Sequence, residues 1–214
     1  MITLVATAHR EGGKCNSAEL YKIIERISPE IIFEEISPNE YVAIYKGLRA
    51  DNLESKTLKR YWQKHSIEHL AVDIEPDELI DIRLKNEISE LFGIFNTNPK
   101  YDRLSIQHNN LTEHFGFSYL NSDQCSVMLE RIHLLEEAIL RAKNQEKLFQ
   151  TYMLWLNIHE KRENEMINNI YNYSKQKKYE NGLFLVGAAH RKSIIEKIPK
   201  FENDFKLKLN WIFN

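Results

Sequence analysis

The amino-acid sequence predicts an α/β protein with a mostly parallel central sheet flanked by helices, a helical insertion in the middle and an edge strand at the C-terminus. Short apolar runs alternate with helical patterns at both ends of the chain, whereas the middle carries helical periodicity alone. The first and last apolar runs lack polar alternation, which is typical of strands buried on both faces of a parallel sheet. With 214 residues, we expect a single domain, 1–214, with the helical insertion at about 76–178.

Four short runs rich in β-branched and large apolar residues are the expected strands: residues 2–8, 31–36, 67–73 and 183–187. Between the first two runs, Ser17 is expected to cap a helix over residues 18–27 that ends at Ser28-Pro29, which completes a βαβ unit. Apolar residues alternate with polar ones over residues 205–213. This alternation predicts an edge or half-exposed strand, through which the protein could form an oligomer.

The middle of the chain predicts three helices. The first begins at Pro76 and places four apolar residues on one face, Ile80, Leu84, Ile88 and Leu91. The second has the same periodicity at Met128, Ile132, Leu135 and Ile139. The third extends over about residues 145–174. Residues 96–124 are polar but contain several aromatic side chains, and they form either a lid or specificity loop or a packed helix.

Composition and charge argue against several classes of partner. A net charge of −2 gives no overall field that attracts nucleic acid or an anionic membrane, and the basic run at residues 59–65 is expected to be a solvated helix face. We expect no signal peptide, and no stretch approaches the roughly 18 apolar residues of a membrane span. Cys15 and Cys125 alone can form neither a disulfide framework nor a zinc site. We therefore expect a cytoplasmic protein with no nucleic-acid or membrane partner.

Ionisable residues stand at the ends of the predicted strands, where an open parallel α/β sheet binds its ligands. These residues are His9, Glu34, Glu35, Asp73 and His190, the last of them after a turn of small residues. Any one of them could be a helix cap or a solvated surface group. Two histidines beside two carboxylate-bearing strand ends predict a functional site. Strand alternation points Glu34 and Glu35 in opposite directions, so only one of the two carboxylates is expected to face the site.

Arg162 lies on the apolar face of the third predicted helix. That face also carries Tyr152, Trp155, His159, Met166, Ile170 and Tyr173. A buried guanidinium needs a carboxylate partner, because an unpaired buried charge is very costly. Arg162 therefore forms a structural ion pair with Asp73 or Glu35, or it stabilises an anion in the site. Both alternatives place it at the strand ends, with His159 on the same face.

The same residues resemble the motifs of a known superfamily. Ala6-Thr7-Ala8-His9, a serine-containing helix, Pro29 and Glu35-Ile36 resemble the opening of the TraB/TIKI and erythromycin-esterase/ChaN-like superfamily. Later in the chain, residues 162–166 resemble its arginine helix, Gly187-Ala188-Ala189-His190 its second Gly-x-x-His turn, and Val72-Asp73 its strand-end aspartate. Ala6 replaces the first motif glycine, and Lys161 stands where many members have glutamate.

The resemblance implies hydrolysis without a serine or cysteine nucleophile. TIKI-like members are metal-dependent peptidases, and erythromycin-esterase-like members use a histidine to activate water. ChaN-like members bind haem, and TraB-like members are linked to peptide-pheromone control. This range of activities leaves the substrate open, beyond a small molecule or a peptide.

Three hypotheses follow from these residues. In the first, a hydrolase of ester or peptide bonds uses His9 as general base oriented by Glu35, His190 as a second acid or base, and Arg162 to stabilise the oxyanion. Glu34, Asp73 and His159 are supporting residues. A metal-assisted variant uses His9, Glu35 and His190 to bind Mn²⁺, Co²⁺ or Zn²⁺, although the charge of Arg162 favours a metal-free site. The second hypothesis is a non-catalytic binding or regulatory protein, and the third is a haem carrier, for which no sequence feature selects an axial ligand.

Overall fold

A computed structural model describes residues 1–213 and contains one five-stranded sheet in which every pair of neighbouring strands is parallel. The strands are β1 (Ile2–Thr7), β2 (Ile31–Glu34), β3 (Glu68–Ala71), β4 (Gly182–Gly187) and β5 (Trp211–Phe213). Their order across the sheet is β3-β2-β4-β1-β5. The predicted α/β class with a central parallel sheet is therefore confirmed.

Strand β4 comes late in the chain and lies between β1 and β2, so the two N-terminal strands are not neighbours. Gly182 is in register with both Ile2 and Ile31. Every residue of β1, β2 and β4 is buried, which agrees with their lack of polar alternation. Because the three strands are parallel and begin in register, the residues that follow them lie close together at one edge of the sheet.

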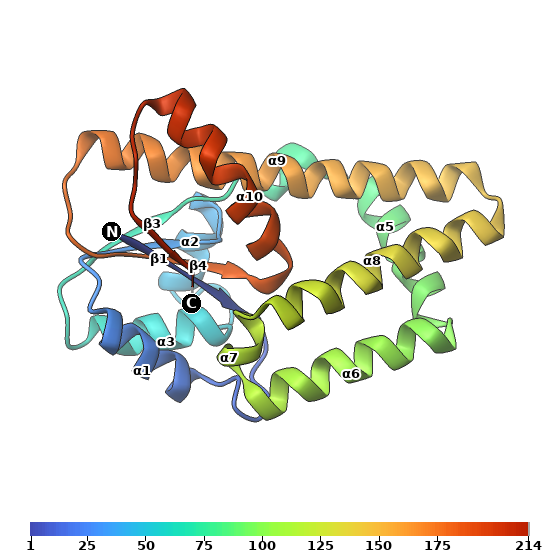
Figure 1. The fold of residues 1–214 in the computed structure, drawn as a ribbon, viewed down its shortest axis with the longest axis horizontal. Helices are drawn as coiled ribbons and strands as arrows, with labels where there is room; N and C mark the ends of the chain where they lie inside the picture. Colours follow the sequence, from blue (N-terminus) through green and yellow to red (C-terminus); the bar gives the residue numbers. More distant parts are fainter. Residues whose placement is uncertain (214) are drawn as a thin grey trace.

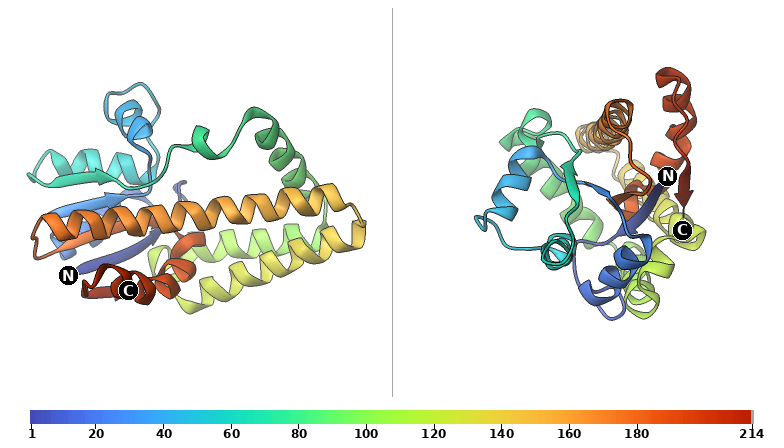
Figure 2. Two further views of the ribbon diagram at one scale, coloured as in Figure 1. Left: turned by 90° about the horizontal axis from the view of Figure 1, so that it is seen from above. Right: turned by 90° about the vertical axis from the view of Figure 1, so that its left-hand side faces the viewer.

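Helices cover both faces of the sheet (Figure 2). One face packs against α1 (Ser17–Ile27), α3 (Leu53–Trp62) and α7 (Phe117–Leu120). The opposite face packs against α9 (Glu146–Gln176) and α10 (Ala188–Phe205). The short helix α2 (Pro38–Tyr45) follows β2, and it continues into residues that border a cavity beyond the carboxyl ends of the strands.

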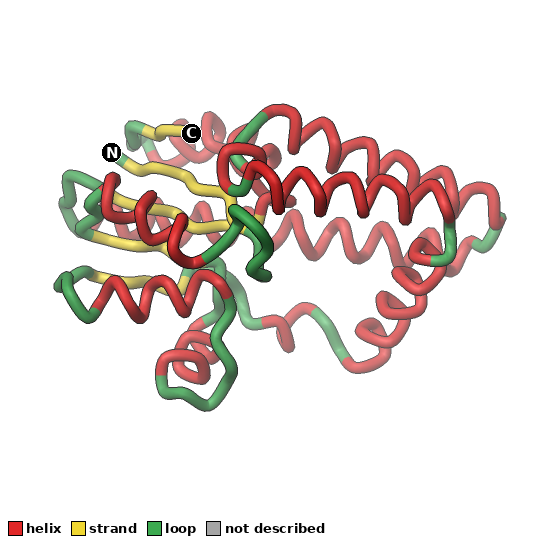
Figure 3. Tube along the Cα trace, turned by 90° about the horizontal axis from the view of Figure 1, so that it is seen from below, coloured by secondary structure: helices red, strands yellow, loops and turns green. Residues whose placement is uncertain are grey.

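The middle of the chain forms a helical extension beside the sheet (Figures 1 and 3). It contains α4 (Pro76–Leu79), α5 (Ile82–Asn96), α6 (Pro99–Phe115) and α8 (Asp123–Lys143). Helix α9 joins the two parts, because Tyr152 packs in the core of the extension and Ile170 packs on the sheet. Arg162 lies between these two positions and so reaches the boundary between the sheet and the extension.

Residues 96–124, which the sequence left open, are packed helices. Phe117 and Leu120 of α7 are buried, and the Asn121 side chain holds the main chain of β1. Its Oδ1 accepts from the Ala6 N–H at 2.7 Å, and its Nδ2 donates to the Ala6 carbonyl at 3.0 Å. Ala6 lies within a regular strand and has no positive φ, so alanine fits this position without backbone strain.

Several predicted boundaries differ from the structure. Asn16, not Ser17, caps α1, since its side chain accepts from two N–H groups of the first turn. The helix predicted from Pro76 is two helices, because Asp81 caps the start of α5. Of residues 205–213, only Trp211–Phe213 form a strand, β5, which pairs with β1 at an edge of the sheet. Phe205 instead ends α10, where its ring lies 5.3 Å from that of Tyr171.

Within residues 1–213, the structure has no helix that combines the length and the apolar character needed to cross a membrane. The basic run at residues 59–65 covers the end of α3 and the turn that follows it, and its Arg60, Lys64 and His65 are exposed. Tyr61, between them, packs into the core. The exposed basic side chains agree with a solvated helix face.

Candidate functional site

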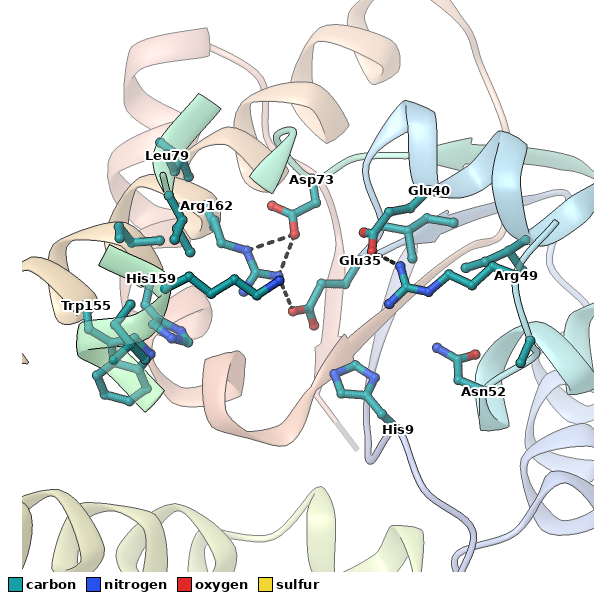
Figure 4. Close-up of a pocket in the computed structure, with 17 residues that line it drawn as sticks. His9, Glu35, Glu40, Arg49, Asn52, Asp73, Leu79, Trp155, His159 and Arg162 are labelled. Carbon is teal, nitrogen blue, oxygen red and sulfur yellow. Dashed lines mark hydrogen bonds and ion pairs between the residues drawn. The ribbon is translucent and has the colours of Figure 1, made fainter. Parts of the chain in front are cut away.

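Arg162 reaches both carboxylates that the sequence offered as partners (Figure 4). Its Nε and Nη2 atoms donate to Asp73 Oδ2 at 2.9 and 2.5 Å, and Nη2 also donates to Glu35 Oε1 at 2.7 Å. Among the described residues, Nη1 has no hydrogen-bond acceptor, and 26 % of the side chain is exposed. The guanidinium is therefore fixed on one side and open on the other.

Glu35 is a buried carboxylate surrounded by donors. His190 Nε2 lies 3.3 Å from its Oε1, and the Gly187 N–H donates to Oε2 at 2.5 Å. Burial alone would raise the pKa of Glu35, but His190, Arg162 and the Gly187 N–H outweigh burial and lower that pKa to about 2. A Cβ atom at position 187 would lie 3.2 Å from Oε2, so glycine leaves room for this close approach.

His190 is buried and holds a positive charge between two carboxylates. Its Nδ1 lies 2.8 Å from Glu163 Oε1, and its Nε2 faces Glu35. Burial lowers the pKa of His190, but the bonds to Glu163 and Glu35 outweigh burial and raise it to about 9. The imidazolium therefore persists at neutral pH, and neither ring nitrogen is free to accept a proton. His190 does not border the main cavity, so it acts on the site through Glu35.

Glu163 extends these contacts away from the cavity and was not predicted from the sequence. Besides His190, it accepts hydrogen bonds from Ser193 Oγ and Lys197 Nζ. The result is a row of alternating charges, which we call the charge row: Asp73, Arg162, Glu35, His190, Glu163 and Lys197. Its three negative and three positive groups balance, which is how buried charges are tolerated.

His9 follows β1 and stands at the open end of the site. Its Nδ1 lies 3.4 Å from Glu54 Oε1, and 61 % of its side chain is exposed. The bond to Glu54 outweighs burial and raises the pKa of His9. Its Nε2 lies 3.7 Å from where a Cβ of residue 187 would be, close to Glu35. The carboxylate that contacts His9 is thus Glu54, not Glu35 as expected.

Glu54 is a second site residue that sequence reasoning missed. It is 4 % exposed, in the first turn of α3, and it also accepts a hydrogen bond from Thr7 Oγ1 at 2.6 Å. The available signal was the Asn52 cap, which places Glu54 in a first helical turn. Nothing in that local pattern indicates that α3 packs against the end of β1.

Glu34 and His159 lie as predicted from the sequence, Glu34 on the side of its strand opposite to Glu35 and His159 on the same helix face as Arg162. Glu34 points away from Glu35 and bonds His69 Nε2 at 2.7 Å and the Tyr45 hydroxyl at 2.9 Å. It does not border the main cavity. The His159 ring stacks on that of His190 with centroids 4.9 Å apart. Burial and the neighbouring positive charges lower the pKa of His159 to about 4, so this ring is neutral.

The site opens into a cavity of about 570 Å³, a size that accommodates a small organic ligand. His9, Glu35, Asp73, His159 and Arg162 border it, together with Glu40, Arg49, Asn52 and Lys85. Figure 4 shows the Arg162 guanidinium between Asp73 and Glu35, with the His9 ring below Glu35 in this view. Apolar side chains from α2, α4, α5 and α9 supply much of the remaining wall.

The residues expected to hold a divalent metal do not fit one. No group of three or more His, Cys, Asp or Glu side chains among the described residues is placed to bind a metal ion. Both ring nitrogens of His190 face carboxylates, and Glu35 is engaged by Arg162, Gly187 and His190. The positive charge of Arg162 already neutralises Glu35 and would repel a metal cation bound beside it.

The two cysteines are not nucleophiles. Cys15 and Cys125 are both unpaired and buried. Burial raises the pKa of each thiol to about 11, so both stay protonated at neutral pH. Neither residue borders the cavity.

His9 after β1 and Gly187 and His190 after β4 therefore lie at one edge of the sheet, with Arg162 between Asp73 and Glu35. The resemblance to the TraB/TIKI and erythromycin-esterase/ChaN-like superfamily stays a prediction from those motifs. No family model matches the chain, and comparisons with curated proteins and with solved structures find no match.

Proposed function

We propose that the protein hydrolyses ester or peptide bonds with a water molecule activated by His9, without a serine or cysteine nucleophile. One observation carries this proposal. His9 pairs through Nδ1 with a buried carboxylate, while most of its ring is exposed in a cavity that also holds an open guanidinium. A histidine oriented by a carboxylate beside an oxyanion donor is the arrangement that general-base hydrolysis requires.

The tautomer of His9 follows from its partner. Glu54 faces Nδ1 and favours the neutral tautomer that carries its proton on Nδ1, which leaves the Nε2 lone pair free to accept a proton from water. The water oxygen then attacks the substrate carbonyl carbon, and the carbonyl oxygen becomes an oxyanion. When the intermediate collapses, the bond to the leaving group breaks and the imidazolium returns its proton to that group.

Arg162 is the candidate oxyanion donor. Asp73 and Glu35 fix Nε and Nη2, and this leaves Nη1 to donate to the carbonyl oxygen as its negative charge grows. A donor held in place before the reaction needs no reorganisation in the transition state. Glu35 positions the guanidinium, and His190 positions Glu35 and keeps it ionised. These two groups are positioning residues in this mechanism.

Activity assays on a panel of p-nitrophenyl esters and short peptides test the proposal. His9→Ala should lower kcat/KM by at least about 100-fold, the usual contribution of a general base. His114→Ala is the matched control, because His114 is exposed and does not border the cavity. Wild-type rates in His9→Ala would refute the assignment. A wild type inactive on the whole panel would favour the non-catalytic binding or regulatory alternative.

A further inference from the structure

The positive groups that border the main cavity differ in whether a carboxylate neutralises them. Arg162 pairs with Glu35 and Asp73, and Arg49 pairs with Glu40. His9 faces Glu54. Lys85 borders the same cavity from α5, and it lies within 4.0 Å of no carboxylate among the side chains that the structure describes. Among the described side chains that border the cavity, Lys85 is therefore the positive group without a carboxylate partner.

Much of the wall of this cavity is apolar. Ile88 lies one helical turn beyond Lys85 on α5, and the two residues border the cavity together. Other apolar lining residues are Ile36, Ile44, Leu79, Ile80, Trp155 and Ile158. A lysine ammonium beside an apolar wall suits a ligand that has both a hydrocarbon part and an anionic group.

We propose, on the basis of the hydrolase function above, that the substrate is an ester or amide with an apolar acyl group and a separate carboxylate, as in an N-acyl amino acid. Lys85 binds that carboxylate and is the specificity-determining residue. The one ammonium of Lys85 matches the −1 of a carboxylate better than the −2 of a phosphate monoester. The apolar wall takes the acyl group, and the scissile carbonyl lies between His9 and Arg162.

Isothermal titration calorimetry with two probes tests this assignment. N-octanoylglycine and N-octanoylglycinamide differ only in the carboxylate, and both are titrated into the His9→Ala variant, in which turnover does not interfere. The acid should bind about fivefold more tightly than the amide, the size expected of a solvent-accessible ion pair. Lys85→Met in the same background should abolish the preference, and added NaCl should weaken it.

Lys100→Met is the matched control, because Lys100 is an exposed lysine of α6 that does not border the cavity. This variant should keep the preference for the acid. Equal binding of the two probes, no binding of either, or a preference that survives Lys85→Met would overturn the assignment of Lys85. These outcomes are independent of turnover. A Lys85-dependent preference without any hydrolysis by the wild type would refute only the hydrolase, whereas His9-dependent hydrolysis without the preference would refute only the carboxylate site.

Discussion

Replacing Glu35 by glutamine keeps the shape of the side chain but removes the negative charge between Arg162 and His190. The size of the effect follows from the pKa of Glu35. Lowering this pKa from 4.5 to about 2 corresponds to about 3 kcal/mol of stabilisation at neutral pH, at about 1.4 kcal/mol per pH unit. Breaking a buried ion pair from one side costs a similar amount, about 3–5 kcal/mol. We therefore expect Glu35→Gln to lower the free energy of unfolding by about 3 kcal/mol at pH 7.

The loss of stability caused by Glu35→Gln should depend on pH. A carboxyl whose pKa is lowered by folding stabilises the protein above its unfolded-state pKa, and the stabilisation disappears as the pH falls through the folded-state pKa. For Glu35, the window runs from 4.5 down to about 2. The difference between wild type and Glu35→Gln should therefore shrink by about 2 kcal/mol between pH 7 and pH 3.

Urea unfolding followed by circular dichroism measures both quantities. Glu25→Gln is the control, because Glu25 is an exposed carboxylate of α1 and its loss should cost less than about 0.5 kcal/mol. A Glu35→Gln effect below about 1 kcal/mol at pH 7 would show that the charge row does not hold Glu35 ionised. An effect of the same size at pH 7 and pH 3 would show that the loss comes from packing.

Three further predictions concern other contacts of the site. Glu54→Gln should move the acid limb of the kcat/KM profile to lower pH, because Glu54 raises the pKa of His9 and the general base must be unprotonated; an unmoved limb would exclude Glu54 as the partner. The stabilisation from His190 should be complete below pH 6.5 and lost as the pH rises through about 9, so the urea midpoint should fall over that range, and a flat midpoint would contradict the raised pKa. Asn121→Ala should lower stability by about 2 kcal/mol in thermal unfolding, because it leaves the buried Ala6 N–H and carbonyl without their side-chain partner; an unchanged Tm would show that water replaces it.

Much of the site could be predicted because strand and helix periods are local properties of the sequence. The unalternated runs identified the buried strands, and the carboxyl ends of parallel strands meet at one edge. The phase of α9 placed Arg162 toward that edge, and it does bond Glu35 and Asp73. Strand alternation pointed Glu34 and Glu35 in opposite directions, and the motif resemblance selected Glu35 of the two.

The rest depends on contacts between elements distant in sequence. Glu54 lies 45 positions after His9 in the sequence, and the two side chains come into contact because α3 packs against β1. Glu163 meets Lys197 only when α10 lies against α9. The strand predicted over residues 205–213 was too long. Their alternation is real, but a strand needs a partner, and only Trp211–Phe213 pair with β1.

The position of β4 also determines when the protein can fold during synthesis. The ribosome delivers β1 and β2 early, but the sheet keeps a gap one strand wide until residues 182–187 emerge. Such pairing between distant segments slows folding, since a long loop must close before any contact compensates for its entropy. Gly187 and His190 arrive with the same segment, so the central strand and its contacts with Glu35 form together. Before this point, the edges of β1 and β2 that face β4 are unpaired, and exposed strand edges of this kind favour aggregation.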